Sequence, residues 1–318
     1  MSRAESLPVD VARPRARRGE PEGPDPLVRP RAKDLVLAYI ALTKPRIIEL
    51  LLVTTVPSMV LAAEGWPSTL LVFYTLIGGT LAAGGANAIN CYVDRDIDQV
   101  MGRTRKRPLP MHKVPARSAL LFGIGLGVAA FSFLAVTVNT ISAVLAICAL
   151  LFYVFVYTLG MKRTTPQNIV IGGAAGAVPA LVGWSAVTGT VDLAALVMFG
   201  IIFYWTPPHF WALALKYEKD YAAARVPMMP VVYGVKETTR HVLLYSFLLF
   251  AMCLALFSVA RLGLFYLGAA LVLNGAFIAM AIKLYRKPDA QNAWWLFRLS
   301  IYYLALLFAA IAVDVIVF

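Results

Sequence analysis

Long apolar segments separated by short polar ones run along most of this chain, beginning near residue 47. A helix needs about 20 apolar residues to cross the roughly 30 Å of hydrocarbon in a bilayer. The segments do not alternate apolar and polar residues as barrel strands do, so only helices can satisfy their backbone hydrogen bonds in lipid. The pattern predicts an all-α integral membrane protein with nine transmembrane helices, at residues 47–63, 69–93, 117–137, 140–160, 168–188, 192–214, 241–260, 262–283 and 295–318.

The first 33 residues differ from the rest because they are rich in Pro and Arg and show no apolar periodicity. Such a composition predicts a disordered arm. The arm lacks the apolar stretch of a secretory signal peptide, so we do not expect it to be cleaved as one. The chain is therefore predicted to consist of a disordered cytoplasmic arm at 1–33 and a nine-helix membrane domain at 34–318.

Composition supports the membrane assignment. The 318 residues are 60% apolar and 14% charged, whereas soluble domains are about 45–50% apolar and about 25% charged. The three cysteines, Cys91, Cys148 and Cys253, are scattered through apolar runs without the spacing of a disulfide framework or a zinc site. These values exclude a secreted disulfide scaffold and an ordinary water-soluble core.

The distribution of positive charge predicts how the chain is oriented. The net charge is +12, and 26 of the 29 Lys and Arg residues lie in residues 1–46 or in the connections after the even-numbered spans. Lys and Arg beside transmembrane helices favour the cytoplasmic side. We therefore expect a cytoplasmic N-terminus, a C-terminus on the opposite side, and membrane lipid rather than nucleic acid as the partner of this charge.

The end of the second span carries the first candidate site. Asn90, Asp94 and Asp98 are four residues apart, and each such step turns a helix by only about 40°, so the three share one face. Asp96 points the other way. Two carboxylates at this spacing repel each other unless a cation binds between them. Oxygen ligands of this kind favour Mg²⁺. Polar residues at such a position are usually functional.

Cations follow these acids directly and predict a diphosphate clamp. The connection supplies Arg103 and Arg107, with Arg105 and Lys106 between them, and such groups bind phosphate oxygens well. A second cluster follows the sixth span, where Lys216 and Asp220 are four apart on one predicted helix face and Arg225 comes next. We expect the two half-sites to face each other across the bundle. The alternative is a solvated helix end for the first cluster and a salt-bridged helix end for the second.

Two further segments have more than one interpretation. Tyr157, Lys162 and Arg163 end the fourth span and could be interface anchors. The segment WTPPHFW, residues 205–211, places two prolines that should kink or break the sixth span ahead of His209. This histidine is either a packing residue or a recognition residue for an aromatic acceptor.

Taken together, these motifs resemble the UbiA superfamily of intramembrane prenyltransferases. The pattern N-x-x-x-D-x-x-x-D at 90–98, the basic segment RTRKRPLP and the second acidic motif carry the general resemblance. It becomes narrower, toward the members that farnesylate haem b, in four segments: LTKPR (42–46), YTLGMKR (157–163), PPHFWALAL (207–215) and KDYAAARVPMMPV (219–231). The resemblance spans roughly residues 38–310 and implies nine helices around a central cavity with an active site at the cytoplasmic side.

The resemblance also implies roles for individual residues. Asn90, Asp94 and Asp98 would bind Mg²⁺ and the diphosphate of farnesyl diphosphate, with Asp220 in the second motif. Lys216 stands where an acid is often found, so it would neutralise diphosphate directly. A haem-specific role for His209, through iron ligation, propionate contact or proton transfer, fits the narrower resemblance. The diphosphate contacts would come from Arg103, Arg107, Lys162, Arg163 and Arg225.

The expected reaction transfers a farnesyl group to a vinyl group of haem b with addition of water, which gives haem O and diphosphate. A related enzyme with another acceptor, such as a quinone precursor or chlorophyllide, is the close alternative. A secondary transporter is the distant one, but it should carry its charges at mid-membrane. We expect a multi-pass protein of the bacterial plasma (inner) membrane and a downstream haem-modifying enzyme as a partner.

Overall fold

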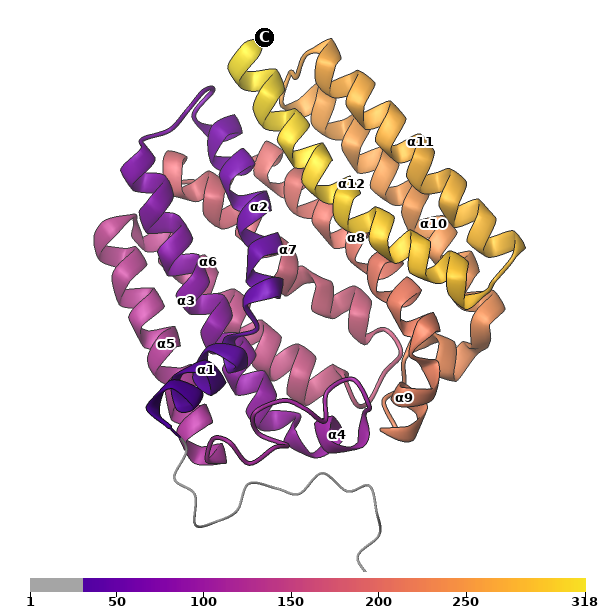
Figure 1. Cartoon of the computed structure of the whole chain (residues 1–318). Coiled ribbons are helices and arrows are strands. Elements are labelled where there is room, and N and C mark those ends of the chain that lie inside the picture. Colours follow the sequence, from indigo (N-terminus) through magenta and orange to yellow (C-terminus); the bar gives the residue numbers. More distant parts are fainter. Residues whose placement is uncertain (1–30) are drawn as a thin grey trace, which may run out of the picture.

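The structure, a computed structural model, describes residues 31–318, apart from the side chains of residues 46, 47 and 49–52. This range is helical and contains no β-strand (Figure 1). Residues 1–30 of the predicted arm at 1–33 lie outside the described residues. The elements are α1 (Ala32–Thr43), α2 (Pro45–Ala62), α3 (Thr69–Val93), α4 (Arg95–Val100), α5 (Ala116–Thr137), α6 (Thr140–Leu151), the π-helix η1 (Phe152–Met161), α7 (Asn168–Thr188), α8 (Leu193–Lys216), α9 (Glu218–Ala223), α10 (Met229–Val259), α11 (Leu264–Arg286) and α12 (Ala290–Val317).

Eight of the described helices are long and apolar enough to cross a membrane: α3, α5, α6 with η1, α7, α8, α10, α11 and α12. The apolar part of α2 within the described residues, Val53–Ala62, is shorter than a span. The all-helical membrane class is therefore confirmed, and the count of nine stays a prediction. Most helix ends agree with the predicted spans within a few residues.

The start of α10 differs from the prediction. The helix begins at Met229 rather than near residue 241, so part of the predicted loop at 216–240 is helical. Pro230 lies in the first turn, where the missing N–H costs no helical hydrogen bond. Gly234 then bends the helix with a φ of 75°, a conformation that glycine adopts without strain.

The prolines of α8 also behave differently from the prediction. Pro207 and Pro208 lie inside a helix that runs from Leu193 to Lys216 without a break. A proline removes a helical hydrogen bond, but packing against neighbouring helices keeps such helices intact in membranes. Here α8 is packed between α7, α10 and α12, and both prolines are buried. Of the two predicted outcomes, the break does not occur, and the kink stays a prediction.

Small residues bring α3 and α5 into close contact. A Cβ atom added to Gly85 would lie 2.7 Å from the carbonyl oxygen of Gly123, and one added to Gly123 would lie 2.7 Å from Ile89 Cγ1. Helices in lipid associate largely through such close packing. The contact fixes the polar end of α3 against its neighbour.

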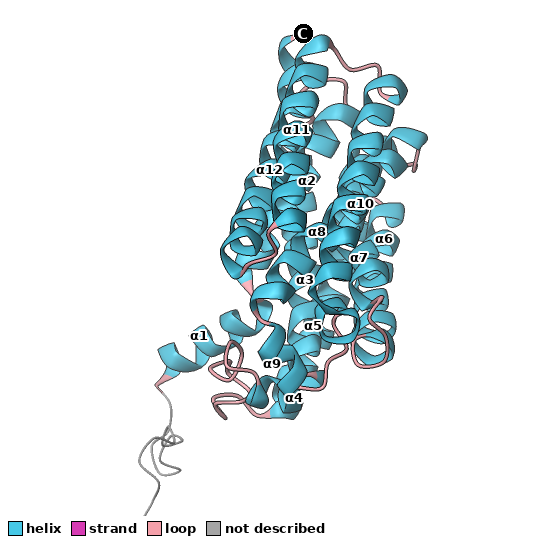
Figure 2. Ribbon diagram, turned by 90° about the vertical axis from the view of Figure 1, so that its right-hand side faces the viewer, coloured by secondary structure: helices cyan, strands magenta, loops and turns pink. Residues whose placement is uncertain are grey.

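The short helices α1, α4 and α9 lie at one end of the bundle, and the C-terminus lies at the other (Figures 1 and 2). The segments that follow α3 and α8 therefore reach the same end, as the half-site prediction requires. Which end faces the cytoplasm stays a prediction.

The second half of the predicted span at 140–160 is wound as a π-helix rather than an α-helix. The backbone i→i−5 pattern is seen where the Lys162 N–H donates to the Tyr157 carbonyl at 2.8 Å. The Thr158 side chain also donates to the Tyr153 carbonyl, at 2.8 Å. π-Helical turns are often found at functional sites. This one turns Thr158 and Lys162 toward the polar end of α3.

Candidate active site

Asn90 and Asp94 contact each other at the polar end of α3. The helix ends at Val93, but the Asp94 N–H still donates to the Asn90 carbonyl at 2.9 Å, and the Asp98 N–H donates to the Asp94 carbonyl at the same distance. The helical spacing therefore continues into α4. Asn90 Nδ2 donates to Asp94 Oδ2 at 2.8 Å, and also to Thr158 Oγ1 at 3.1 Å. Asn90, Asp94 and Asp98 are all buried.

Cations from the end of η1 neutralise Asp94. Lys162 Nζ donates to Asp94 Oδ2, and a guanidinium nitrogen of Arg163 lies 3.8 Å from Asp94 Oδ1. That second oxygen is buried and accepts no hydrogen bond from the described residues. A buried carboxylate oxygen without a donor is costly unless a charge lies close to it.

The other two acids of this segment have guanidinium partners. Arg107 Nη1 donates to both carboxylate oxygens of Asp98, at 2.9 and 2.7 Å. Arg163 donates to both oxygens of Asp96 at 2.6 Å, and this hydrogen bond is the main reason that the pKa of Asp96 falls to about 2. Arg163 thus lies close to both carboxylates, of which Asp96 is exposed and Asp94 is buried.

Lys44 is a site residue that sequence reasoning did not single out. Its Nζ donates to Asn90 Oδ1 at 2.7 Å, and its backbone joins α1 to α2 with a φ of 53°. Removal from water disfavours the ammonium and lowers the pKa of Lys44 to about 8. In the sequence, Lys44 was marked only by its place in the segment LTKPR. In the structure, α2 begins at Pro45, directly after Lys44.

The second motif faces the first, but with a different local geometry from the one predicted. Tyr217 separates α8 from α9, so Lys216 and Asp220 do not share one continuous helix face, and that prediction is wrong. The carboxylate of Asp220 faces the backbone after α4, since a Cβ atom on Gly102 would lie 3.6 Å from its Oδ2. Arg103 donates to the Tyr221 hydroxyl at 3.3 Å. These two contacts join the half-sites.

The remaining cations of the second motif lie at its edge. Lys216 is exposed, and its Nζ lies 3.6 Å from the centre of the Trp294 ring on α12. Arg225 is exposed and follows α9 with a φ of 53°. Neither lies in the Asn90–Asp94–Lys162 cluster.

His209 belongs to a separate buried cluster between α8 and α12. Its ring stacks on Trp205 with centroids 4.3 Å apart, and its Nδ1 lies 2.6 Å from Ser300 Oγ. His209 is 7% exposed. A packing role and a recognition role for His209 differ in what its two ring nitrogens bind.

A divalent cation fits the acidic cluster only with ligands from outside the chain. Within residues 31–318, no three or more His, Cys, Asp or Glu side chains come together closely enough to hold a metal ion. Mg²⁺, however, commonly binds through one or two carboxylates and completes its shell with water and substrate phosphates. Asp94 Oδ1, which accepts no hydrogen bond from the described residues, and the neighbouring Asn90 amide offer the hard oxygen atoms for that arrangement.

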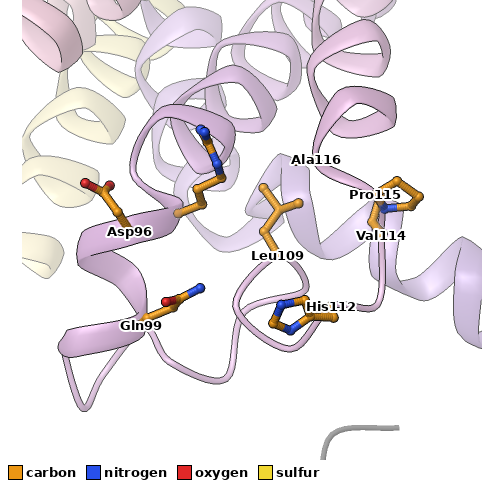
Figure 3. Close-up of a pocket in the computed structure, with 8 residues that line it drawn as sticks. Asp96, Gln99, Leu109, His112, Val114, Pro115 and Ala116 are labelled. Atoms are coloured by element: carbon orange, nitrogen blue, oxygen red, sulfur yellow. The ribbon is translucent and has the colours of Figure 1, made fainter. Parts of the chain in front are cut away.

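A cavity of about 430 Å³ opens beside α4 and is lined by residues of α4 and of the loop that follows it. Figure 3 shows Gln99 of α4 and His112 of the following loop on either side of it, with Leu109 between them. Asp96 also lines this cavity. The cavity is at the bundle end rather than along its axis, and the predicted central cavity stays a prediction.

Fold and site together define an all-helical membrane protein with a buried cluster of carboxylates and cations at one end of its bundle. The sequence pattern of the UbiA prenyltransferase family matches residues 51–310, and the chain belongs to this family. The family resemblance predicted from the motifs is confirmed.

Curated relatives are similar along nearly the whole chain. A protoheme IX farnesyltransferase of Parafrankia sp. is 54% identical over 296 residues, which cover 91% of this chain and 95% of the relative. Protoheme IX farnesyltransferase 1 of Saccharopolyspora erythraea is 55% identical over 285 residues, which cover 89% of this chain and 91% of the relative.

Solved structures share the fold at low sequence identity. A digeranylgeranylglyceryl phosphate synthase superposes with a TM-score of 0.74 at 17% identity, covering 89% of this chain and 99% of that one. A UbiA homologue from Archaeoglobus fulgidus, bound to DMAPP and Mg²⁺, superposes with a TM-score of 0.63 at 18% identity, covering 86% of this chain and 99% of that one. At this identity the likeness establishes the fold alone.

Proposed function

We propose that this protein transfers the farnesyl group of farnesyl diphosphate to a vinyl group of haem b, with addition of water, to give haem O and diphosphate. The observation that carries the proposal is the similarity to protoheme IX farnesyltransferases at about 55% identity over nearly their full length. Membership in the UbiA prenyltransferase family supports the same reaction class. These relatives favour haem b over a quinone precursor or chlorophyllide as the acceptor.

In this proposal the acidic cluster holds Mg²⁺. Asn90, Asp94 and Asp98 would bind it from the first motif and Asp220 from the second. The buried Asp94 Oδ1, which accepts no hydrogen bond from the described residues, supports the assignment, as does a homologous fold bound to Mg²⁺ and a prenyl diphosphate. When bound, the metal would stabilise negative charge on the departing diphosphate.

The cations around the acids form the rest of the diphosphate site. Lys162 and Arg163 approach Asp94 from η1, and Arg107 approaches Asp98 from the loop after α4. Arg103 reaches across to α9, so it can contact an anion that lies between the motifs. Lys216 and Arg225 would add positive charge at the edge. Preorganised charges of this kind stabilise the charge that develops as a bond breaks.

The chemistry follows from these charges. Stabilised diphosphate leaves the allylic carbon of farnesyl diphosphate with the C–O bonding electrons. The vinyl group of haem b donates its π electrons to that carbon and forms the new C–C bond. Water adds to the resulting cation and loses a proton, which leaves a hydroxyl group. An apolar setting between helices protects the carbocation from early hydrolysis.

We further propose that the protein lies in a bacterial plasma membrane with its N-terminus in the cytoplasm and its C-terminus on the opposite side. The distribution of Lys and Arg supports this orientation. A haem-modifying enzyme that accepts haem O is the expected downstream partner, because the product is too apolar to cross water freely.

The direct test is to incubate the purified full chain with farnesyl diphosphate, haem b and Mg²⁺ and to identify the pigments by mass. We expect a product with the mass of haem b plus a farnesyl group and a hydroxyl group. A matched incubation with geranyl diphosphate tests the donor. Unchanged haem b in every incubation, or transfer only to a quinone precursor, would contradict the proposed function.

A further inference from the structure

Ser300 of α12 anchors two rings of α8 within the membrane domain. Its Oγ lies 2.6 Å from His209 Nδ1, and its backbone carbonyl accepts a hydrogen bond from Trp205 Nε1 at 2.9 Å. The Trp205 ring stacks on the imidazole with centroids 4.3 Å apart, and the Phe297 ring lies tilted against it with centroids 4.7 Å apart. Ser300 is fully buried. The His209 ring is therefore fixed in position by contacts from both helices.

The hydrogen bonds of Ser300 also determine which ring nitrogen of His209 carries the proton. A serine hydroxyl has one proton, and Ser300 Oγ donates it to the Phe297 carbonyl at 2.6 Å, because a carbonyl oxygen only accepts. Toward His209 the same Oγ is therefore an acceptor, so Nδ1 is the protonated nitrogen. In a neutral imidazole the other nitrogen, Nε2, then keeps its lone pair.

This arrangement separates the roles open to His209. A proton relay through Nδ1 ends at the Phe297 carbonyl, which has no proton to pass on. A propionate would meet the lone pair of Nε2 rather than an N–H, which is repulsive. An iron ion, in contrast, needs a nitrogen lone pair. Histidines that bind metals generally donate their other N–H to a protein acceptor, and here Ser300 Oγ is that acceptor.

We propose that His209 Nε2 is the axial ligand of the iron when haem b is bound as the acceptor, an inference that rests on the proposed function. Ser300 is then a positioning residue, because it fixes the tautomer of His209 that can bind iron. Histidine is a common axial ligand of haem iron. His209 is buried, with 7% of its surface exposed. Phe210 packs edge-to-face on the imidazole at 5.2 Å and is itself 37% exposed.

The test compares two porphyrins that differ only in the metal. The purified full chain in detergent is titrated with haem b and, separately, with iron-free protoporphyrin IX. We expect His209→Gln to remove the imidazole-ligated haem spectrum and weaken haem binding, while protoporphyrin binding stays unchanged. Ser300→Ala should weaken haem binding by about 10- to 100-fold, the usual effect of losing a partner of a metal ligand, again without changing protoporphyrin binding.

Ser246→Ala is the matched control. Ser246 is equally buried, and among the described residues its hydroxyl bonds the Val242 carbonyl of its own helix, so its loss should leave both titrations unchanged. A second variant, His209→Gly, should regain the ligated spectrum when free imidazole is added, which a packing role does not predict.

Two outcomes would overturn the inference. Equal losses of haem and protoporphyrin binding in His209→Gln would make His209 a packing residue, and an unchanged haem spectrum in that variant would exclude iron ligation. Either result leaves the proposed function intact if the unaltered protein still makes haem O. Failure to make haem O at all contradicts the proposed function instead, because the pigment assay does not depend on these variants.

Discussion

Lys44 Nζ donates a hydrogen bond to Asn90 Oδ1 at 2.7 Å, across 46 residues of sequence. The contact ties the junction of α1 and α2 to the polar end of α3. It orients the Asn90 amide so that its Nδ2 faces Asp94. The junction between two N-terminal helices is thereby part of the candidate active site.

The first prediction concerns this contact. Lys44→Met should lower the kcat/KM of farnesyl transfer by about 10- to 100-fold, because a hydrogen bond from a charged donor contributes about 1.5–3 kcal/mol. Lys44→Arg keeps the positive charge, so its kcat/KM should fall less than that of Lys44→Met. Lys33→Met, on the exposed side of α1, is the control. Steady-state kinetics of the purified variants measure the effect, and equal activity of Lys44→Met and Lys33→Met would contradict it.

The second prediction separates the catalytic role of Asp94 from its role in folding. Asp94→Ala should lower turnover by about 100-fold or more, since charge stabilisation at the leaving group is lost. It should also destabilise the protein by about 3–5 kcal/mol, because Lys162 is left without its buried partner. The double variant Asp94→Ala with Lys162→Met should recover thermal stability in detergent but not turnover. Recovery of both would mean that Asp94 is only structural.

The third prediction tests the metal. Turnover should fall to background when EDTA removes divalent cations and should return when Mg²⁺ is added in excess. Within the described residues, three or more metal-binding side chains do not come together, so we expect Mg²⁺ to bind more tightly in the presence of inorganic diphosphate, which supplies further oxygen ligands. Isothermal titration with and without diphosphate measures this. Full turnover in EDTA would contradict the metal assignment.

The fourth prediction concerns a buried acid far from this site. Asp314 of α12 accepts hydrogen bonds from the N–H groups of Gly263 and Tyr266, at 2.6 and 2.9 Å, and so caps the start of α11. Asp314→Ala should lower stability by about 0.5–2 kcal/mol, the usual effect of losing such a cap. Asp314→Asn keeps one acceptor oxygen and should lose less. Thermal unfolding measures the change, and activity should remain at temperatures where the fold is intact.

The fifth prediction uses two glycines of the same helix. Gly85→Ala forces a Cβ atom to within 2.7 Å of the Gly123 carbonyl and should cost about 1–3 kcal/mol through overpacking. Gly79→Ala meets nothing within 4 Å and should be neutral or slightly stabilising, since alanine favours helix. Thermal unfolding of the two variants compares them directly. Equal stabilities would show that α3 and α5 can move apart without cost.

Much of the fold could be predicted because its signals are local. The apolar runs of about 20 residues located eight long helices, and the four-residue spacing of Asn90 and Asp94 placed their side chains together. The predictions failed where packing overrode local preference. Pro207 and Pro208 do not break α8, because neighbouring helices hold it, and Tyr217 separates Lys216 from Asp220 although their spacing suits one helix.

The sequence by itself determined the membrane class, the family and the types of residue in the site, because hydropathy, charge and short motifs are carried by neighbouring residues. Only the tertiary structure decided the partners of those residues. Lys44 and Asn90 are 46 residues apart, Lys162 and Asp94 are 68 apart, and Ser300 and His209 are 91 apart. Such pairs depend on how distant helices pack, and a helical period of 3.6 residues carries no information about that packing.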